Sequence, residues 1–333
     1  MLAVEWLGTL LTLLPWGLLA DRIGERRVLA TGLAACGILL VAAGRTSSYP
    51  LFVLLLFLVG AAGASVSAAS GRAVMGWFAA EERGLALGIR QTAIPAGGFA
   101  AALVLPQLDV AGAFAALGVF CLLGAAAGAL FVREPRAVAR LADEVEWTIR
   151  DRRLWVLCLG SGLYLVAQIA LIGFVVLYLH DERGLGEGEA AAVLAAIQVV
   201  AAALRIAAGR WSDVLRLRVL PLRRIGLATA FALAVATALL DGPLAVLIPA
   251  FVVAGALSMA WNGLSFTVAA ELAGRIRSGA AIGVQQSSLS AFGVAVPIAF
   301  AALVAATSWH AGYALAALCP VVGWWVLRPL ADR

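Results

Sequence analysis

Long apolar blocks recur along the chain and constrain its fold more than any other feature of the sequence. A helix needs about 20 consecutive, mostly apolar residues to cross the core of a lipid bilayer. The clearest blocks of this kind are residues 28–44, 51–70, 111–132, 154–179, 190–208 and 225–240. Irregular backbone cannot face lipid, because its N–H and C=O groups would lack hydrogen-bond partners. The sequence therefore predicts an all-α polytopic membrane protein surrounded by the lipid bilayer.

The composition supports the same conclusion. Of the 333 residues, 63% are hydrophobic and only 13% are charged, whereas a soluble domain is about 45–50% apolar and about 25% charged. So few charges could not keep a water-facing surface solvated. The formal net charge is +5 and all 24 basic residues are Arg, but these Arg residues gather between the apolar blocks. We therefore expect no nucleic-acid partner.

Eleven membrane spans are predicted along the chain. They lie at about residues 1–20, 28–46, 50–76, 84–106, 111–132, 154–179, 189–208, 224–240, 244–268, 279–305 and 310–327. Basic residues concentrate on the cytoplasmic side of membrane proteins, and alternate loops here are either rich in Arg or hold only Arg45 or Arg183. The Arg-rich loops are predicted to be cytoplasmic. This places the protein in the cell membrane as a multi-pass protein, with a cytoplasmic C-terminus and Met1 outside.

The chain contains an internal repeat. The stretch GLLADRIGERR begins at Gly17, and the related stretch GRWSDVLRLR begins at Gly209, at an offset of 192. A second match, at an offset of 195, aligns Gly84, Gly88, Gln91 and Thr92 with Gly279, Gly283, Gln286 and Ser287. Two matches at nearly one offset predict two homologous halves. We expect an N-terminal bundle at 1–132, a cytoplasmic linker at 133–153 and a C-terminal bundle at 154–333.

The repeat also predicts a missing helix. The second half opens with a span near Leu154, and the offset of 192 places its partner upstream of Met1. The first bundle is therefore expected to hold five helices and to lack its first. A start codon upstream would explain this, and so would a truncated chain. A truncated, transport-inactive scaffold or remnant is one alternative function.

Two stretches resemble a known family. The loop GLLADRIGERR at 17–27 resembles the signature loop between helices two and three of the major facilitator superfamily, and residues 71–98 resemble helices four and five of that superfamily. The resemblance implies two six-helix halves around a central cavity, alternating access, and a solute site near mid-bilayer. It implies a monomeric secondary transporter of a small organic solute, driven by an ion gradient or by exchange. The cavity would be lined by the spans at 50–76, 154–179 and 244–268.

The repeated loops are the predicted conformational gate. The residues concerned are Gly17, Asp21, Arg22, Gly24 and Arg26 in the first copy, and Gly209, Asp213 and Arg218 in the second. A carboxylate at such a helix end accepts hydrogen bonds from the partly positive N-terminus of a helix in the other half. The alternative is a solvated turn that only fixes topology. The second copy lacks the glycine that would match Gly24, so its resemblance is weaker.

Arginines inside the spans suggest an anionic solute. Arg72 and Arg90 lie roughly 13 Å and 10 Å from the cytoplasmic ends of adjacent helices. Two guanidiniums at similar depth bind a carboxylate or a phosphate well. In the alternative interpretation Arg72 pairs with Asp21 or with loop acids, and Arg90 extends to the lipid headgroups. Arg205 lies nearer the cytoplasmic end, and we expect it to extend to the headgroups.

Glu5 is a candidate carrier of a coupling proton, and the helix expected upstream of Met1 is an alternative place for the coupling carboxylate. Glu5 lies in the first apolar span, roughly 24 Å along the helix from Asp21. A carboxylate buried in a membrane span is costly and is a candidate for function. The alternative is a place near the outer headgroups.

Uncharged polar residues on the predicted spans complete the candidate cavity. They are Gln91, Tyr164, Gln168, Trp261, Asn262, Gln285 and Gln286. An aromatic face next to an amide, as in Trp261 and Asn262, suits a small polar organic solute. The alternative is that these side chains hold helices together through hydrogen bonds.

Several other classes of site are not expected. The four cysteines lie in apolar blocks without a CxxC pair, so no disulfide framework or metal site is predicted. The chain has no Lys and no Walker motif. His180 and His310 lie in predicted outer loops, without a catalytic constellation around them. We therefore expect no enzyme and no cofactor. The stretch from Pro95 to Gly98 partly resembles drug antiporters, which leaves a drug or metabolite efflux antiporter as another alternative.

Overall fold

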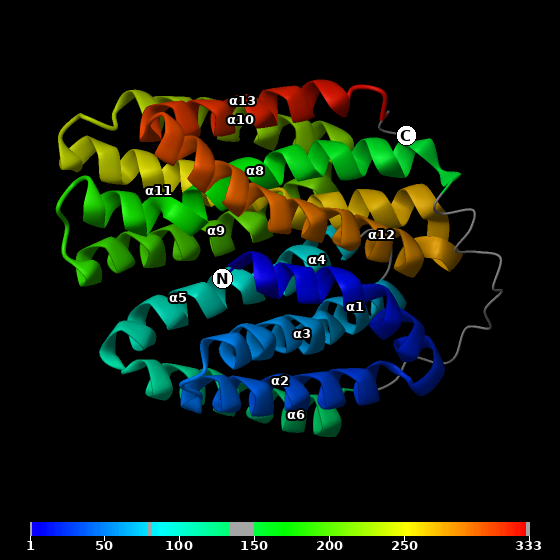
Figure 1. Cartoon of the computed structure of the whole chain (residues 1–333). Helices are drawn as coiled ribbons and strands as arrows, with labels where there is room; N and C mark the ends of the chain where they lie inside the picture. Colours follow the sequence, from blue (N-terminus) through cyan, green and yellow to red (C-terminus); the bar gives the residue numbers. More distant parts are fainter. Residues whose placement is uncertain (1, 79–81, 133–149, 331–333) are drawn as a thin grey trace. The chain divides into compact units, whose positions relative to one another are not determined.

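The computed structural model describes residues 2–78, 82–132 and 150–330, and the regular structure in these ranges is helical (Figure 1). The helices are α1 (Leu2–Ile23), α2 (Glu25–Arg45), α3 (Tyr49–Trp77), α4 (Arg83–Gln91), α5 (Ala93–Val104), the 3-10 turn η2 (Leu105–Gln107), α6 (Val110–Phe131), α8 (Arg152–Asp181), α9 (Glu187–Leu215), α10 (Val219–Ala238), α11 (Leu244–Ala260), α12 (Asn262–Ala306) and α13 (Trp309–Val326). In the described ranges, eight segments are long and apolar enough to cross a membrane. The all-α polytopic prediction is confirmed, and the count of eleven spans stays a prediction.

Two of the predicted spans are divided in the structure, and α12 continues from one of them through the predicted span at 279–305. The span at 84–106 is divided into α4 and α5, which meet at Thr92. The span at 244–268 is divided at Trp261, where α11 ends and α12 begins. Pro95 explains the first division, because proline has no N–H to donate to the carbonyl four residues before it. At both divisions a helix ends in the middle of an apolar segment, so its last backbone carbonyls have no partner within that helix.

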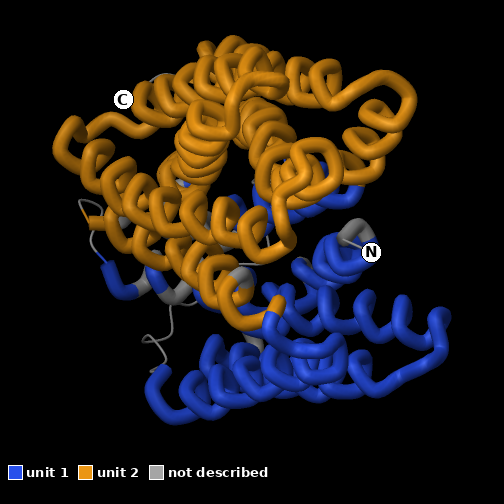
Figure 2. Tube along the Cα trace, turned by 90° about the vertical axis from the view of Figure 1, so that its left-hand side faces the viewer, with its two compact units in different colours: residues 1–78, 107–150, 273–294 blue, residues 79–106, 151–272, 295–333 orange. Residues whose placement is uncertain are grey.

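The chain forms two compact units (Figure 2). Unit 1 comprises residues 1–78, 107–150 and 273–294, and unit 2 comprises residues 79–106, 151–272 and 295–333. Helices α4 and α5 thus belong to unit 2, although they precede the predicted linker. The division into bundles at 1–132 and 154–333 stays a prediction, and residues 133–149 of the linker lie outside the described residues.

Unit 1 is built on close contacts between helices. Helix α3 packs against α1 and α2, and α2 packs against α6 (Figure 1). A Cβ atom at Gly60 of α3 would collide with the backbone of Glu5 in α1, so the two helices approach at backbone distance. The Thr9 hydroxyl donates to the Gly60 carbonyl at 3.1 Å across this contact. Small residues at helix contacts permit this approach in a membrane.

Unit 2 has an extended apolar core. Helix α8 packs against α10, α11 and α13, and α9 packs against α11, α4 and α5. An aromatic group at one end of the core comprises Phe174, Tyr178, Phe251, Phe300, Trp309 and Tyr313. The buried Tyr178 hydroxyl donates to the Leu240 carbonyl at 2.8 Å. The Ser161 and Ser265 hydroxyls form a buried hydrogen bond of 2.6 Å between α8 and α12.

Candidate functional site

Helices α4 and α9 pack at backbone distance along a line that we call the α4–α9 seam. It comprises Gly84, Leu85, Gly88 and Gln91 of α4, and Arg205, Gly209 and Asp213 of α9. A Cβ atom at Gly209 would lie 2.5 Å from the Gly84 carbonyl oxygen, and one at Gly88 would lie 2.9 Å from the Arg205 carbonyl oxygen. The residue numbers of these pairs change in opposite directions, so the two helices are antiparallel. Glycine is needed here because any side chain would separate them.

Asp213 lies at one end of the α4–α9 seam. Its carboxylate is 3% exposed and accepts a hydrogen bond of 2.8 Å from the backbone N–H of Leu85, in the first turn of α4. The first N–H groups of a helix have no partner within the helix and carry partial positive charge. Asp213 thus caps α4 from a different helix.

Arg218 holds the Asp213 carboxylate in place. Its guanidinium forms an ion pair with Asp213, donates to the Ser212 hydroxyl at 3.0 Å, and donates through Nε to Glu271 at 3.0 Å. Burial lowers the pKa of Arg218, but the hydrogen bonds and charges of Asp213 and Glu271 raise it by more, so the net shift is upward. The group is therefore a permanent cation between two carboxylates.

The first copy of the repeated loop is described only in part. Gly17 lies in α1 and Arg26 is exposed, while the side chains of Asp21 and Arg22 lie outside the described residues. The backbone of Gly24 has φ 89°, a value that glycine adopts readily. The gate proposed for this copy stays a prediction.

The second copy keeps a positive φ without glycine. Arg216 lies 192 residues after Gly24 and has φ 53° and ψ 29°. An Arg in this left-handed conformation costs about 1–2 kcal/mol. The sequence lacks the glycine of the motif here, yet the chain still turns with a left-handed residue at this position.

The observed position of Arg205 differs from the predicted one. The sequence predicts that it extends to the headgroups, but its side chain is buried, at 1% exposure. The guanidinium donates to the Met259 carbonyl at 2.8 Å, to the Asn262 Oδ1 at 3.0 Å and to the Gln91 carbonyl. Helix ends supply these acceptors, since the last four carbonyls of a helix have no partner within it. The prediction was wrong because it took no account of acceptors on other helices.

Arg90 lies next to this cluster. It is half-buried, and it donates to the Gln91 Oε1 at 3.3 Å. Gln91 thus accepts from Arg90 through its side chain and from Arg205 through its backbone. The side chain of Arg72 lies outside the described residues, so the pair of Arg72 and Arg90 stays a prediction.

Tyr164 and Trp261 contact each other inside unit 2. Their rings meet edge to face at a centroid distance of 6.0 Å, and both side chains are buried. A Cβ atom at Gly323 of α13 would lie 2.8 Å from the Tyr164 ring, and one at Gly226 of α10 would collide with its hydroxyl. Tyr164 therefore points toward α10 and α13. Within the described ranges, its hydroxyl and the Trp261 Nε1 have no hydrogen-bond partner.

The remaining predicted cavity residues are divided between the units. Gln168 is half-buried in unit 2, and its Oε1 has no hydrogen-bond partner among the residues that the structure describes. Gln285 is buried and Gln286 is half-buried, both on the part of α12 that belongs to unit 1. Glu5 belongs to unit 1 as well and is exposed at the start of the apolar segment 4–13 of α1.

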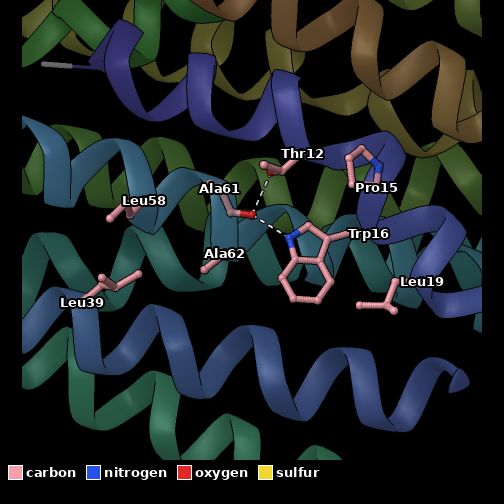
Figure 3. Close-up of a pocket in the computed structure, with 8 residues that line it drawn as sticks. All are labelled: Thr12, Pro15, Trp16, Leu19, Leu39, Leu58, Ala61 and Ala62. Carbon is pink, nitrogen blue, oxygen red and sulfur yellow. Dashed lines mark hydrogen bonds between the residues drawn. The ribbon is translucent and has the colours of Figure 1, made fainter.

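A pocket of about 420 Å³ lies among α1, α2 and α3 of unit 1 (Figure 3). Its lining residues are Thr12, Pro15, Trp16, Leu19, Leu39, Leu58, Ala61 and Ala62. The Thr12 hydroxyl and the Trp16 Nε1 both donate to the Ala61 carbonyl, at 2.8 Å and 2.7 Å. These polar groups satisfy one another, so the pocket presents an apolar wall and does not suit a polar solute.

Comparisons with known proteins agree with this fold. The sequence profile of the Major Facilitator Superfamily matches residues 1–297. An uncharacterized MFS-type transporter of Mycobacterium tuberculosis (strain H37Rv) is 33% identical over 321 residues, covering 94% of this chain and 72% of that protein. A second such transporter, from strain CDC 1551 of that species, is 32% identical with the same coverage.

Solved structures with lower identity share the fold. The human organic anion transporter MFSD10 has a TM-score of 0.83 and 16% identity, over 98% of this chain and 82% of that one. The fucose:proton symporter FucP of E. coli has a TM-score of 0.75 and 17% identity, over 99% and 90%. The proton:xylose symporter XylE has a TM-score of 0.77 and 17% identity, over 99% and 85%. With its apolar helices, its repeated loop and these relatives, the chain belongs to the Major Facilitator Superfamily of multi-pass membrane transporters.

Proposed function

We propose that the protein is a secondary active transporter that moves a small organic solute by alternating access, and that Asp213 is part of its gate. The hydrogen bond of 2.8 Å from the Leu85 N–H to the Asp213 carboxylate carries the proposal. Helix α4 precedes the predicted linker and α9 follows it, so this bond joins segments from the two repeated halves.

The chemistry of this bond suits a contact that forms and breaks. Asp213 keeps its ion pair with Arg218 when the bond to Leu85 breaks, so the carboxylate is never left without a partner. The N-terminal N–H groups of α4 would then be exposed to water, which satisfies them. The hydrogen-bonding groups are therefore satisfied whether α4 and α9 are in contact or apart. The bond from the Leu85 N–H to Asp213 favours the state in which they are in contact.

In our proposal this end of α9 is cytoplasmic, because it is followed by one of the Arg-rich loops. The bond would therefore close the cytoplasmic side and would break when the transporter opens inward. The C-terminus, which follows another Arg-rich end, would also be cytoplasmic.

We also propose an anionic solute and a coupling proton. Arg90 is half-buried in unit 2, where it donates to the Gln91 side chain, and it is the guanidinium that we propose for the anion. Among the structural relatives, one is an organic anion transporter and two are proton symporters. Glu5 is the carboxylate on an apolar segment that we propose as the proton carrier.

Transport by Asp213→Asn tests the gate. The purified protein is reconstituted in vesicles, and uptake of a panel of labelled sugars and organic anions is measured with and without an imposed pH gradient. The asparagine keeps the shape but loses the charge that α4 and Arg218 bind. We expect at least a tenfold loss of uptake, with membrane insertion and melting temperature close to those of the unmodified protein.

Asp181→Asn is the matched control, because Asp181 is exposed at the far end of α8. We expect uptake by this variant to be unchanged. Unchanged uptake by Asp213→Asn would contradict the gate, and the absence of uptake of every solute by the unmodified protein would contradict this solute class.

A further inference from the structure

A single arginine, Arg205, donates hydrogen bonds at two helix breaks in unit 2. Helix α9 is continuous through Arg205, whereas α4 ends at Gln91 and α11 ends at Ala260. The Arg205 guanidinium donates to the carbonyl of Gln91 and to the carbonyl of Met259, the residue before Ala260. It therefore binds the C-terminal ends of two different helices at once.

Pro95 explains why the first of these carbonyls is available. In a continuous helix, the N–H of residue 95 would donate to the Gln91 carbonyl, but proline has no N–H. Helical bonding resumes with the Ala96 N–H, which donates to the Thr92 carbonyl at 2.9 Å. The Gln91 carbonyl is thus left over by the local sequence, and Arg205, 114 residues away, supplies its donor.

The second break is held in a similar way. Asn262 is the first residue of α12, and its side-chain oxygen accepts from Arg205 at 3.0 Å. The Arg205 Nε donates to the Met259 carbonyl at 2.8 Å, on the other side of the break at Trp261. One guanidinium therefore bridges the end of α11 and the start of α12.

The partners of Arg205 carry only partial charges. Among the carboxylate side chains that the structure describes, none forms an ion pair with Arg205. Its charge is instead balanced by the partly negative C-terminal ends of α4 and α11. Carbonyls at the ends of broken helices bind free cations in some transporters. Here the cation is covalently attached to α9.

We propose that Arg205 is a positioning residue that acts as a tethered cation and latches α4 to α9 and to the junction of α11 and α12. Separation of α4 from α9 removes the Gln91 carbonyl and leaves a buried positive charge with one acceptor fewer. The latch therefore favours the closed α4–α9 seam independently of Asp213, which lies eight residues, or about 12 Å, further along α9. The role in transport rests on the function proposed above.

The first test measures access to the seam. The four cysteines are replaced by Ala, Leu85→Cys is introduced as a reporter, and its reaction with a water-soluble maleimide is followed in purified protein. Leu85 is half-buried, so the reporter reacts slowly while the seam is closed. We expect Arg205→Ala to raise the labelling rate at least tenfold. The alanine cannot donate to the Gln91 carbonyl, so α4 loses this bond to α9.

Rescue by a free cation separates the charge from the bulk of the side chain. Guanidinium chloride at non-denaturing concentration is expected to slow the labelling of Arg205→Ala at least threefold by binding where the arginine was. Urea has nearly the same shape and no charge, and we expect it to have no such effect. Equal effects of guanidinium and urea would overturn the tethered-cation proposal.

A second variant keeps the test decisive if Arg205→Ala does not fold. Asn262→Asp supplies a full negative charge to the guanidinium, so Arg205 no longer needs the Gln91 carbonyl for charge balance. We expect faster labelling at Leu85→Cys together with an unchanged or higher melting temperature. A residue that only filled space would give no change in labelling. Because this readout needs no solute, unchanged labelling in the folded variants overturns the latch whatever the transport assay shows.

Discussion

The α1–α3 contact of unit 1 and the α4–α9 seam of unit 2 solve the same packing problem with different chemistry. Both bring two helices to backbone distance through glycine, at Gly60 in the first and at Gly209 in the second. Across α1 and α3 the hydrogen bonds come from neutral side chains, such as Thr12 and Trp16, to the Ala61 carbonyl. Across α4 and α9 the bonds involve the charged groups Arg205 and Asp213.

The difference shows which contact is suited to break. A neutral interhelical hydrogen bond in a membrane contributes about 0.6 kcal/mol, and its loss leaves no charge behind. Loss of one partner of a buried charge costs several kcal/mol unless another group replaces it. Asp213 has such a replacement in Arg218, whereas Arg205 depends on three acceptors at helix ends. Opening of the α4–α9 seam leaves Asp213 paired with Arg218 and is opposed by the bonds of Arg205, so we interpret this seam as a switchable contact with a preferred closed state. The bonds between α1 and α3 that are described above hold no charged group that would favour one state over another, so we interpret this contact as fixed.

Gly60→Val should have the largest effect. Its Cβ atom would collide with the backbone of Glu5, so α1 and α3 must separate along their whole contact. We expect a destabilisation on the order of 3 kcal/mol and poor recovery of folded protein, measured as the melting temperature in detergent.

Gly63→Val is the control on the same helix. A Cβ atom at Gly63 meets no atom within 4 Å, so the same substitution should cost little. Equal stability of the two variants would show that the α1–α3 contact is not fixed.

Gly209→Ala should have a smaller effect on stability and a larger one on transport. The new Cβ atom would lie 2.5 Å from the Gly84 carbonyl oxygen, which forces the α4–α9 seam apart. We expect a loss of about 1–3 kcal/mol, faster labelling of Leu85→Cys and at least a tenfold loss of uptake.

Gly97→Ala is the matched control for this change. Gly97 lies in α5, and a Cβ atom there meets nothing within 4 Å. Its uptake and labelling should equal those of the unmodified protein. If Gly209→Ala melted as early as Gly60→Val, the two contacts would be alike and the comparison would fail.

The sequence predicted the helices and the carboxylate of the α4–α9 seam, but not which helix the carboxylate binds. The apolar blocks predict the spans, because length and hydropathy decide what crosses a bilayer. The repeat offset of 192 locates Asp213 from Asp21 without any structural information. Its partner could be expected only as some helix N-terminus, because a single sequence does not say which helices meet.

The direction in which side chains point within the spans could not be predicted from the sequence. A helix that is apolar all round has no hydrophobic face that fixes its rotation, and so Tyr164 gave no sign that it points toward Gly226 and Gly323. The burial of Arg205 was missed for a related reason. Its only signal is Pro95, which frees a carbonyl on another helix, and pairing the two requires the contact between α4 and α9.

The two copies of the repeated loop offer the finest test of the comparison. Gly24 in unit 1 and Arg216 in unit 2 occupy the same repeat position with positive φ, and only the second is under strain. We expect Arg216→Gly to raise the free energy of unfolding by about 0.5–1 kcal/mol, because it removes the strained side chain. Gly24→Ala should lower it by about 1–3 kcal/mol, because φ 89° with ψ 158° is a conformation that almost only glycine adopts. Melting temperatures in detergent measure both changes. A loss of stability in Arg216→Gly would mean that the arginine side chain itself supports the turn, and that the second copy departs from the first in chemistry as well as in sequence.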